Sequence, residues 1–171
     1  MVVPRKVRYY AQKKEKENIR FRSWLKTNAD PDELDLKFKR LHEELFAEYD
    51  CSRCRNCCRE YHGLIPKKDL EEDAKCLNLS VADFRNRYLQ AEEDVSEEGY
   101  YTKSKPCDFL QESGECILGV CKPVNCVQYP YTDQPDRIGS LLSFLQIIEV
   151  CPVAYEICER LKIEYGFLRM V

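Results

Sequence analysis

Four cysteines stand within eight residues, at Cys51, Cys54, Cys57 and Cys58, in the run CSRCRNCC. Two-residue gaps between cysteines let a tight loop aim several sulfurs at one point, a geometry that both iron–sulfur clusters and zinc knuckles use. Four thiols among such polar neighbours cannot all be core residues. The run therefore predicts metal binding through thiolates.

The spacing of these cysteines also bears on the kind of metal. The steps from Cys51 to Cys54 and to Cys57 are those of a bacterial ferredoxin-type motif, and the distant Cys151-Pro152 repeats the closing Cys-Pro pair of that motif. These features favour an iron–sulfur cluster, of the 4Fe-4S kind, with zinc as the alternative.

Adjacent Cys57 and Cys58 restrict the geometry of the site. In an extended backbone, consecutive side chains point to opposite faces, so both thiols reach one ion only if the chain turns sharply. Otherwise the site is larger than one ion, or one of the two thiols serves a second site. Arg53, Arg55 and Arg59 stand beside the thiols, where they either offset the charge of an anionic centre or are simply solvated.

Eleven cysteines in 171 residues is a high and odd count. The first ten residues carry early charges and no apolar segment, so they do not resemble a secretory signal, and the expected location is the cytoplasm. Cytoplasmic reductants oppose permanent disulfides, which favours metal ligation as the use of these thiols. The most apolar stretch, Leu141 to Val150, is interrupted by polar residues and is well below the roughly 20 residues of a membrane span.

The charge balance restricts the possible partners. A formal net charge of -3 and a pI near 5.6 give no overall attraction to nucleic acid or to an anionic membrane. Residues 1–28 are nevertheless basic, and they form either a solvated helix or a basic arm for nucleic acid or an acidic protein partner. The chain has no glycine-rich phosphate loop and no G-x-G-x-x-G motif, so no nucleotide site is expected.

Local signals predict the elements that position the cysteines. Asp30-Pro31-Asp32-Glu33 combines an N-cap, a proline at N1 and a glutamate at N3, and Ser80 to Asp83 forms a second capping box. Pro152 breaks the last helical region near Cys151. We therefore expect a mostly α-helical fold, a single small domain around an irregular cysteine-rich centre, with helices at residues 31–49, 66–76, 80–90 and 140–165.

At most a short β-hairpin is expected beside these helices. Residues 100–110 and 116–118 flank a polar turn, so the predicted hairpin sets Cys107 opposite Cys116. Residues 91–99 are acidic and lack periodicity, which is typical of a surface loop. We divide the chain into an N-terminal helical and basic extension, residues 1–50, and a cysteine-cluster domain, residues 51–171.

Further motifs follow CSRCRNCC along the chain: Ile65-Pro-Lys-Lys-Asp69-Leu70, Pro106-Cys-Asp-Phe-Leu110, Gly114-Glu-Cys116-Ile117, Lys122-Pro123-Val-Asn-Cys126 and Tyr129-Pro130. Over about residues 51–155, this pattern resembles the YkgJ-type zinc- or iron-chelating cysteine-cluster family. The resemblance implies a metal site built from these residues: Cys51, Cys54, Cys57, Cys58, Cys107, Cys116 and Cys126, with Cys151 in the late Cys-Pro pair. The chain departs from the family pattern at Gly119, at Lys122 and at the extra Cys121.

Three functions remain open from the sequence. The first is an iron–sulfur protein with a redox or electron-transfer role. The second is a zinc-stabilised structural or interaction module. The third is a methyl-transferring enzyme or its accessory, by analogy with flagellin lysine N-methylase, so the sequence leaves open whether this protein is an enzyme.

Some cysteines and both histidines have simpler explanations. Cys76 and Cys158 fall on apolar helix faces, so we expect core packing there. Cys121 is expected near Cys116 and Cys126 without ligation. His42 is expected to be structural or on the surface. His62 could enter a zinc sphere, but the abundance of cysteine makes this the weaker interpretation.

Overall fold

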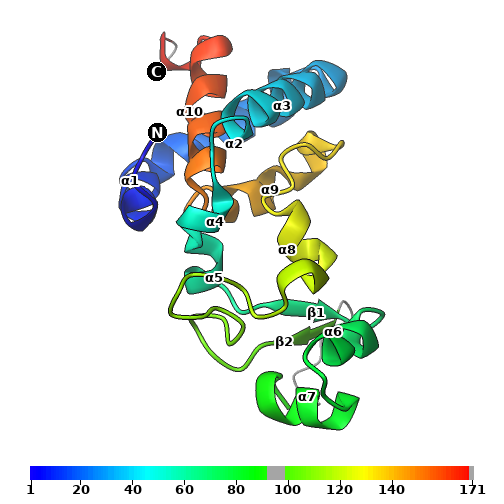
Figure 1. The fold of residues 1–171 in the computed structure, drawn as a ribbon. Helices are drawn as coiled ribbons and strands as arrows, with labels where there is room; N and C mark the ends of the chain where they lie inside the picture. The colour runs from blue at the N-terminus through cyan, green and yellow to red at the C-terminus, as the bar shows by residue number, and fades with distance from the viewer. Residues whose placement is uncertain (92–98, 170–171) are drawn as a thin grey trace. The chain divides into compact units, whose positions relative to one another are not determined.

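The structure is a computed structural model that describes residues 1–91 and 99–169 (Figure 1). The acidic loop expected at residues 91–99 lies, apart from its two ends, outside the described residues. The chain forms two compact units: unit 1 combines Met1–Asp50 with Pro130–Val171, and unit 2 is Cys51–Tyr129. The fold is mostly α-helical with a small antiparallel pair of strands, which confirms the predicted fold class. Among the described helices, none has the length and apolar character that crossing a membrane requires.

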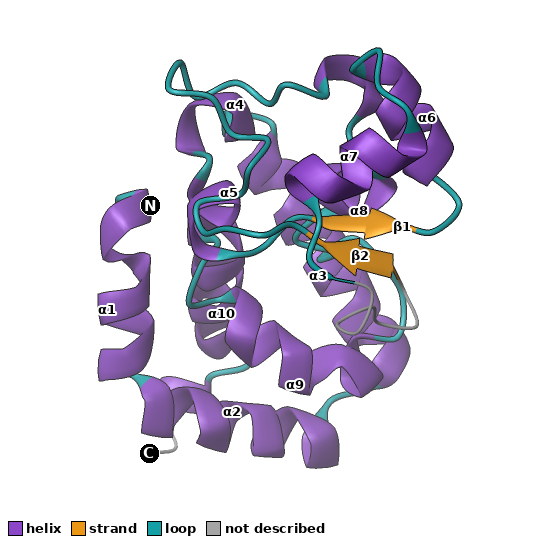
Figure 2. Ribbon diagram, turned by 90° about the horizontal axis from the view of Figure 1, so that it is seen from below, coloured by secondary structure: helices purple, strands orange, loops and turns teal. Residues whose placement is uncertain are grey.

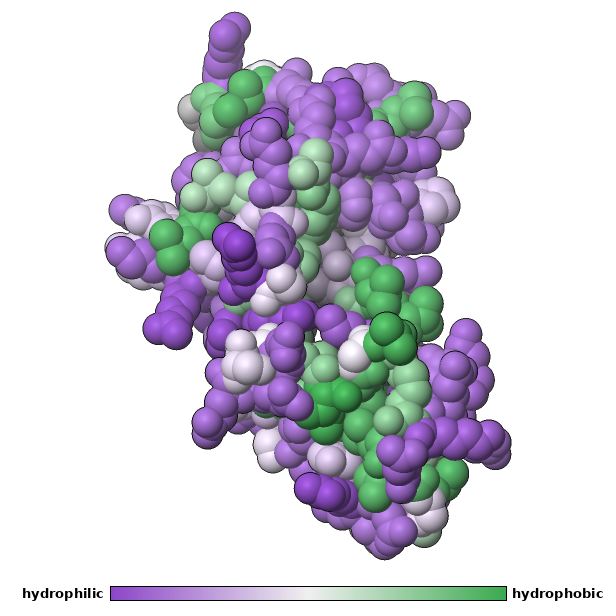
Figure 3. Space-filling view, in the orientation of Figure 1, coloured by the Kyte–Doolittle hydropathy of each residue, from purple (hydrophilic) through white to green (hydrophobic). Residues whose placement is uncertain are grey.

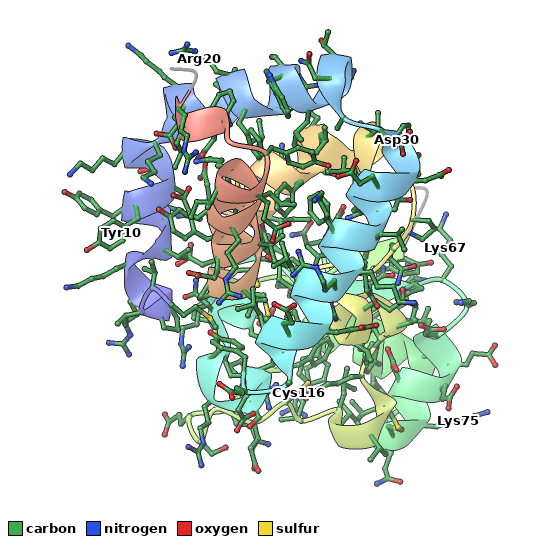
Figure 4. All side chains as sticks on the ribbon, turned by 90° about the horizontal axis from the view of Figure 1, so that it is seen from above. Tyr10, Arg20, Asp30, Lys67, Lys75 and Cys116 are labelled. Atoms are coloured by element: carbon green, nitrogen blue, oxygen red, sulfur yellow. A yellow bond between two sulfur atoms is a disulfide. The ribbon has the colours of Figure 1, made fainter. Side chains whose placement is uncertain are left out.

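Unit 1 is built from helices. Its elements are η1 (Pro4–Lys6), α1 (Val7–Lys13), α2 (Glu15–Asn28), α3 (Pro31–Phe46), α9 (Arg137–Ile147), α10 (Pro152–Glu164) and η4 (Phe167–Arg169). Helix α3 packs against α9 and α10, and α2 runs alongside α9 (Figure 2). The basic segment of residues 1–28 is thus helical, and Tyr10 and Arg20 point outward from α1 and α2 (Figure 4).

Helix α3 begins where the capping signal predicts. The Asp30 carboxylate accepts the Glu33 backbone N–H at 2.9 Å, and Pro31 takes the first helical position. The buried residues of the helix recur at helical spacing, at Leu34, Phe38, Leu41 and Leu45. The helix ends at Phe46, three residues before the predicted end.

The last helical region is interrupted at the predicted point. Helix α9 ends at Ile147 and α10 begins at Pro152, with Cys151 in the N-cap position of α10. Helix α9 begins three residues earlier than predicted because Asp35, on α3, caps it from outside. Both Asp35 oxygens accept backbone N–H groups, from Asp136 and from Arg137, each at 2.8 Å.

A buried ion-pair network joins α2 to α10. Lys162 is fully buried, and its ammonium group donates to Glu17, to Asn18 and to Glu159, each at 2.6 Å. Lys14 also pairs with Glu159. These contacts satisfy a charge that would otherwise be very costly to bury.

Unit 2 combines short elements with long loops. Its elements are α4 (Cys51–Cys54), α5 (Asn56–Glu60), β1 (Leu64–Pro66), α6 (Leu70–Cys76), α7 (Val81–Tyr88), β2 (Gly99–Tyr101), η3 (Gly119–Cys121) and α8 (Val124–Gln128). The predicted helices at 66–76 and 80–90 are present, although α6 begins at Leu70. The Ser80 side chain caps α7 by accepting the Asp83 N–H, as the capping box predicts.

The predicted turn at residues 111–115 is present, because an antiparallel bridge joins Leu110 to Cys116 and the Ile117 N–H donates to the Phe109 carbonyl. Leu110 therefore stands opposite Cys116, and the expectation that Cys107 does so is wrong. Strand β2 pairs with β1, with Ile65 opposite Tyr100. The predicted helix at residues 66–76 does not begin at Pro66, because this proline ends strand β1. Proline is tolerated there because the edge position needs no backbone donor.

The core of unit 2 lies between the strands, α6 and α7. Its buried residues are Ile65, Leu70, Ala74, Phe84, Leu89, Phe109 and Leu118, and the Phe84 and Phe109 rings stack with centroids 5.7 Å apart. Cys107 and Cys116 pack against this cluster. The cysteine loops are therefore anchored on a formed hydrophobic core.

Candidate metal centre

The run CSRCRNCC forms two short helices joined by a sharp turn. Arg55, the residue between α4 and α5, adopts the left-handed conformation with φ 50° and ψ 21°. Such a conformation is uncommon for a residue with a side chain, and the Arg55 Nε group donates to the Gly114 carbonyl at 2.7 Å. Cys51 and Cys54 are three positions apart on α4, which places them on the same helix face.

Cys57 and Cys58 lie close together despite being adjacent in sequence. Both belong to α5, and their sulfurs are 4.0 Å apart. The extended geometry that would have separated them does not occur, because the backbone of both residues is helical. Two sulfurs at 2.3 Å from one tetrahedral ion lie about 3.8 Å apart, so this pair fits ligation of a single ion.

Cys107 is held beside the second of these cysteines. Its backbone N–H donates to the Cys58 carbonyl at 2.8 Å. Its sulfur hydrogen-bonds the Thr102 hydroxyl, which also accepts the Gly63 N–H at 2.7 Å. A Cβ atom placed on Gly63 would stand 2.9 Å from the Cys107 sulfur. Gly63 and Thr102 thus shape the position of Cys107, and no signal in the sequence singled them out.

Cys116 and Cys126 approach the same region from other segments. Cys116 forms the bridge to Leu110, and Cys126 lies on α8. Burial of the Cys126 sulfur, together with the nearby Cys107, Cys58 and Cys116, raises the pKa of this thiol to about 12, although the residue as a whole is exposed. Thiols from four separate segments are therefore within electrostatic reach of one another.

The electrostatics differ sharply within the group. The hydrogen bond from Cys57 lowers the pKa of Cys58 to about 6, with smaller contributions from Arg55, Lys122 and Arg59 and with burial acting in the opposite direction. Burial raises the pKa of Cys107. The Cys58 thiol therefore ionises near neutral pH, while the thiols of Cys107 and Cys126 stay protonated until a metal cation replaces the proton.

Two arginines have structural partners in this region. Arg59 donates to the Cys54 carbonyl at 2.6 Å, and Arg55 reaches Gly114. Both guanidinium groups also lower the pKa of Cys58. The arginines beside the thiols consequently do more than face solvent, because they order the cysteine loops and add positive charge.

The donor set fits a thiolate-bound metal in its chemistry. Within residues 1–91 and 99–169, no three His, Cys, Asp or Glu side chains stand in an arrangement that could hold a metal ion as they are placed. Ligation therefore requires the sulfurs to move closer together. Two features are compatible with such a site. The sulfurs of Cys57 and Cys58 are 4.0 Å apart, and Cys58, Cys107 and Cys116 are close enough to Cys126 to raise its pKa.

Cys76 and Cys121 are joined to each other. Cys76 ends α6 and is exposed, so the expectation that it packs in the core is wrong. A disulfide joins it to Cys121 on η3, with Cα atoms 6.6 Å apart. No signal in the sequence indicated this pair, because Cys121 was expected only near Cys116 and Cys126, and its pairing with Cys76 depends on the packing of α6 against η3.

The remaining cysteines belong to unit 1. Cys151 is buried in the N-cap position of α10, as expected, and its ligation stays a prediction. Cys158 is buried in the core, as predicted, and burial raises its pKa to about 12.

The two histidines are both hydrogen-bonded. His42 Nδ1 is 2.8 Å from the Thr132 hydroxyl, and its ring lies against Phe46, which agrees with a structural role. His62 Nδ1 donates to the Thr102 carbonyl at 2.7 Å.

No protein-family model matches this chain, and comparisons with curated proteins and with solved structures find no match. The resemblance to the YkgJ-type family accordingly rests on the motifs in the sequence.

Proposed function

We propose that this protein binds a metal centre through the cysteine thiolates of unit 2. The observation that carries the proposal is the grouping of Cys58, Cys107, Cys116 and Cys126, which come from four segments, with Cys58 and Cys116 close enough to raise the pKa values of Cys107 and Cys126. Thiols in a purely structural role have no reason to gather in this way. Cys57, 4.0 Å from Cys58, extends the donor set, and Cys51 and Cys54 precede it on α4.

An iron–sulfur cluster with a redox or electron-transfer role is the centre that we favour. The ferredoxin-like steps from Cys51 to Cys57 support this choice. Such a cluster, when bound, supplies reversible one-electron transfer. The protein's own contribution is to hold the thiolates on the hydrophobic core of unit 2 and to offset their negative charge with Arg55, Arg59 and Lys122.

Zinc is the second candidate, and one specific observation favours it. The sulfurs of Cys57 and Cys58 are close to the separation of about 3.8 Å expected for two ligands of one tetrahedral ion. In this case the metal would hold the cysteine loops together, and the helices would serve as the interaction surface. Exposed valines flank Cys126 at Val120, Val124 and Val127, and Figure 3 shows hydrophobic residues gathered on one face of the molecule.

The two centres differ in colour and in redox behaviour. Protein purified without air is expected to be brown, to contain iron and acid-labile sulfide, and to bleach with dithionite. Colourless protein with stoichiometric zinc, and no cluster after reconstitution with iron and sulfide, would replace the iron proposal with the zinc proposal. Absence of any bound metal after both treatments would overturn the function itself.

Variants connect the metal to particular thiols. Cys107→Ala and Cys126→Ala are expected to lose most of the metal, because their sulfurs belong to the group around Cys58. Cys158→Ala is the matched control, since this cysteine is buried in unit 1 and should leave the metal in place. Loss of metal from the control alone would show that the wrong thiols had been assigned.

A further inference from the structure

One pair of cysteines stands apart from the thiols that we assign to metal. All eleven cysteines lie within the described residues, and nine of them are free thiols. Cys76 and Cys121 are the two that form a disulfide, which is drawn as a yellow bond in Figure 4. The chain thus keeps its clustered thiols reduced while it joins two cysteines outside the proposed ligand set.

The position of Cys121 relates this pair to the metal ligands. Cys121 is five residues from Cys116 and five residues from Cys126, and it ends η3, the single turn between them. Its partner Cys76 ends α6, whose residues Leu70 and Ala74 belong to the core of unit 2. The disulfide therefore links η3, which lies between the predicted ligands Cys116 and Cys126, to helix α6.

The pair is open to thiol–disulfide exchange. Cys76 is exposed and Cys121 is half-buried. Each has a lysine as its sequence neighbour, Lys75 and Lys122, and Lys75 points outward from α6 in Figure 4. Exchange requires a thiolate to reach one of the sulfurs, and exposed disulfides are those that small thiols reduce most easily.

We propose that Cys76 and Cys121 form a reversible dithiol–disulfide couple that controls how firmly Cys116 and Cys126 hold the metal. The inference rests on the proposed metal-binding function. The two thiols give up two electrons and two protons to glutathione disulfide, which becomes two molecules of glutathione. One sulfur–sulfur bond breaks in the oxidant and one forms between Cys76 and Cys121.

The effect on the metal follows from chain entropy. With the disulfide closed, the segment from Cys116 to Cys126 has fewer conformations available, so less conformational entropy is lost when its two sulfurs close on a metal. With the disulfide open, η3 can move away from α6, and both ligands leave the metal more readily. Oxidation is therefore expected to slow metal release, and reduction to speed it.

The first experiment measures the oxidation state of Cys76 and Cys121 independently of metal binding. The protein is equilibrated in buffers with different ratios of glutathione to glutathione disulfide, alkylated, digested and analysed by mass spectrometry. A linked Cys76–Cys121 peptide should be replaced by two alkylated peptides as the ratio rises. Persistence of the linked peptide in glutathione alone, or its absence in excess glutathione disulfide, would overturn the proposal.

The second experiment measures metal release with zinc(II) as the probe, because the redox buffer neither oxidises nor reduces zinc(II). Zinc-loaded protein is challenged with a coloured chelator in its oxidised and reduced forms. Release should be at least about fivefold slower from the oxidised protein, which is the lower range of typical coupling between two sites. Cys76→Ser and Cys121→Ser should release zinc at the fast rate in both buffers.

Lys75→Ser is the matched control, because it changes the exposed neighbour of Cys76 and keeps the disulfide. It should retain the difference between the two buffers. Equal release rates from oxidised and reduced protein that binds zinc would overturn the proposed control and leave metal binding intact. Failure of every form to bind either zinc or iron would overturn the proposed function together with this inference, while the mass spectra would still report the couple.

Discussion

Gly63 lies against Cys107 so closely that a side chain at Gly63 has no room. A Cβ atom there would stand 2.9 Å from the Cys107 sulfur and 3.0 Å from the Thr102 methyl group. Thr102 is fully buried and exchanges two hydrogen bonds with Gly63, from its own N–H to the Gly63 carbonyl and from the Gly63 N–H to its hydroxyl. The position of Cys107, a predicted metal ligand, therefore depends on the absence of a side chain at Gly63.

Gly63→Ala is expected to weaken the metal site without unfolding the protein. The added methyl group must displace the Cys107 sulfur, because Thr102 is buried and cannot move away. Metal content of the anaerobically purified variant should fall towards that of Cys107→Ala, while the circular dichroism of the helices stays unchanged. Full metal content in Gly63→Ala would show that Cys107 is not a ligand.

Removal of the metal should loosen unit 2 before unit 1. The cysteine loops connect short elements, whereas unit 1 is held by long helices, so metal binding is expected to be coupled to the order of unit 2. In limited proteolysis with trypsin, chelated and reduced protein should be cut first after Arg53, Arg55 and Arg59. Identical cleavage of metal-bound and metal-free protein would contradict a structural contribution from the metal.

Asp73 makes stability depend on pH. It is 2% exposed, one of its oxygens has no hydrogen-bond partner, and burial raises its pKa from 3.8 to about 6, assisted by Asp69 and Glu72. Because the folded pKa lies above the unfolded pKa, the protonated carboxyl favours the folded state. The contribution of Asp73 to the free energy of unfolding is therefore fully present below about pH 4, and it is lost as pH rises through about 6.

Asp73→Asn should remove this penalty. The difference between the two pKa values corresponds to at most about 3 kcal/mol, so the variant should be more stable than the native protein at pH 7.5 by roughly 1–3 kcal/mol. At pH 4.5 the gain should be much smaller. Urea denaturation at the two pH values measures both quantities, and a pH-independent effect would contradict the assignment to the Asp73 charge.

Lys162 is expected to be essential for the stability of unit 1. Lys162→Met leaves Glu17, Glu159 and the buried Asn18 without their shared donor, which should cost about 3–5 kcal/mol. Arg160→Met is the matched control on the same helix. Arg160 is 41% exposed in its ion pairs with Glu44 and Glu156, and its loss should cost less than about 1 kcal/mol.

Thermal or urea denaturation compares the two variants. If Lys162→Met and Arg160→Met lose the same amount of stability, the buried network does not hold α2 to α10 as the hydrogen bonds indicate. A double variant, Lys162→Met with Glu17→Gln, should recover part of the loss, because it also removes the charge of a carboxylate whose hydrogen-bond donor the first change takes away.

The sequence by itself determined the features that depend on neighbouring residues. The cap at Asp30, the cap at Ser80 and the interruption before Pro152 all appear where local signals predict them. These signals act within one helical turn, so they hold whatever the rest of the chain does. The concentration of thiols in residues 51–58 is likewise visible without a structure.

Only the tertiary structure decided which distant segments meet. It pairs β1 with β2 across more than thirty residues, joins Cys76 to Cys121, and packs Pro130–Val171 with Met1–Asp50. It also places the left-handed Arg55 against the Gly114 carbonyl, between the helices α4 and α5 that carry the clustered cysteines. Each of these outcomes depends on the packing of buried side chains against partners far along the chain, and local spacing carries no record of that packing.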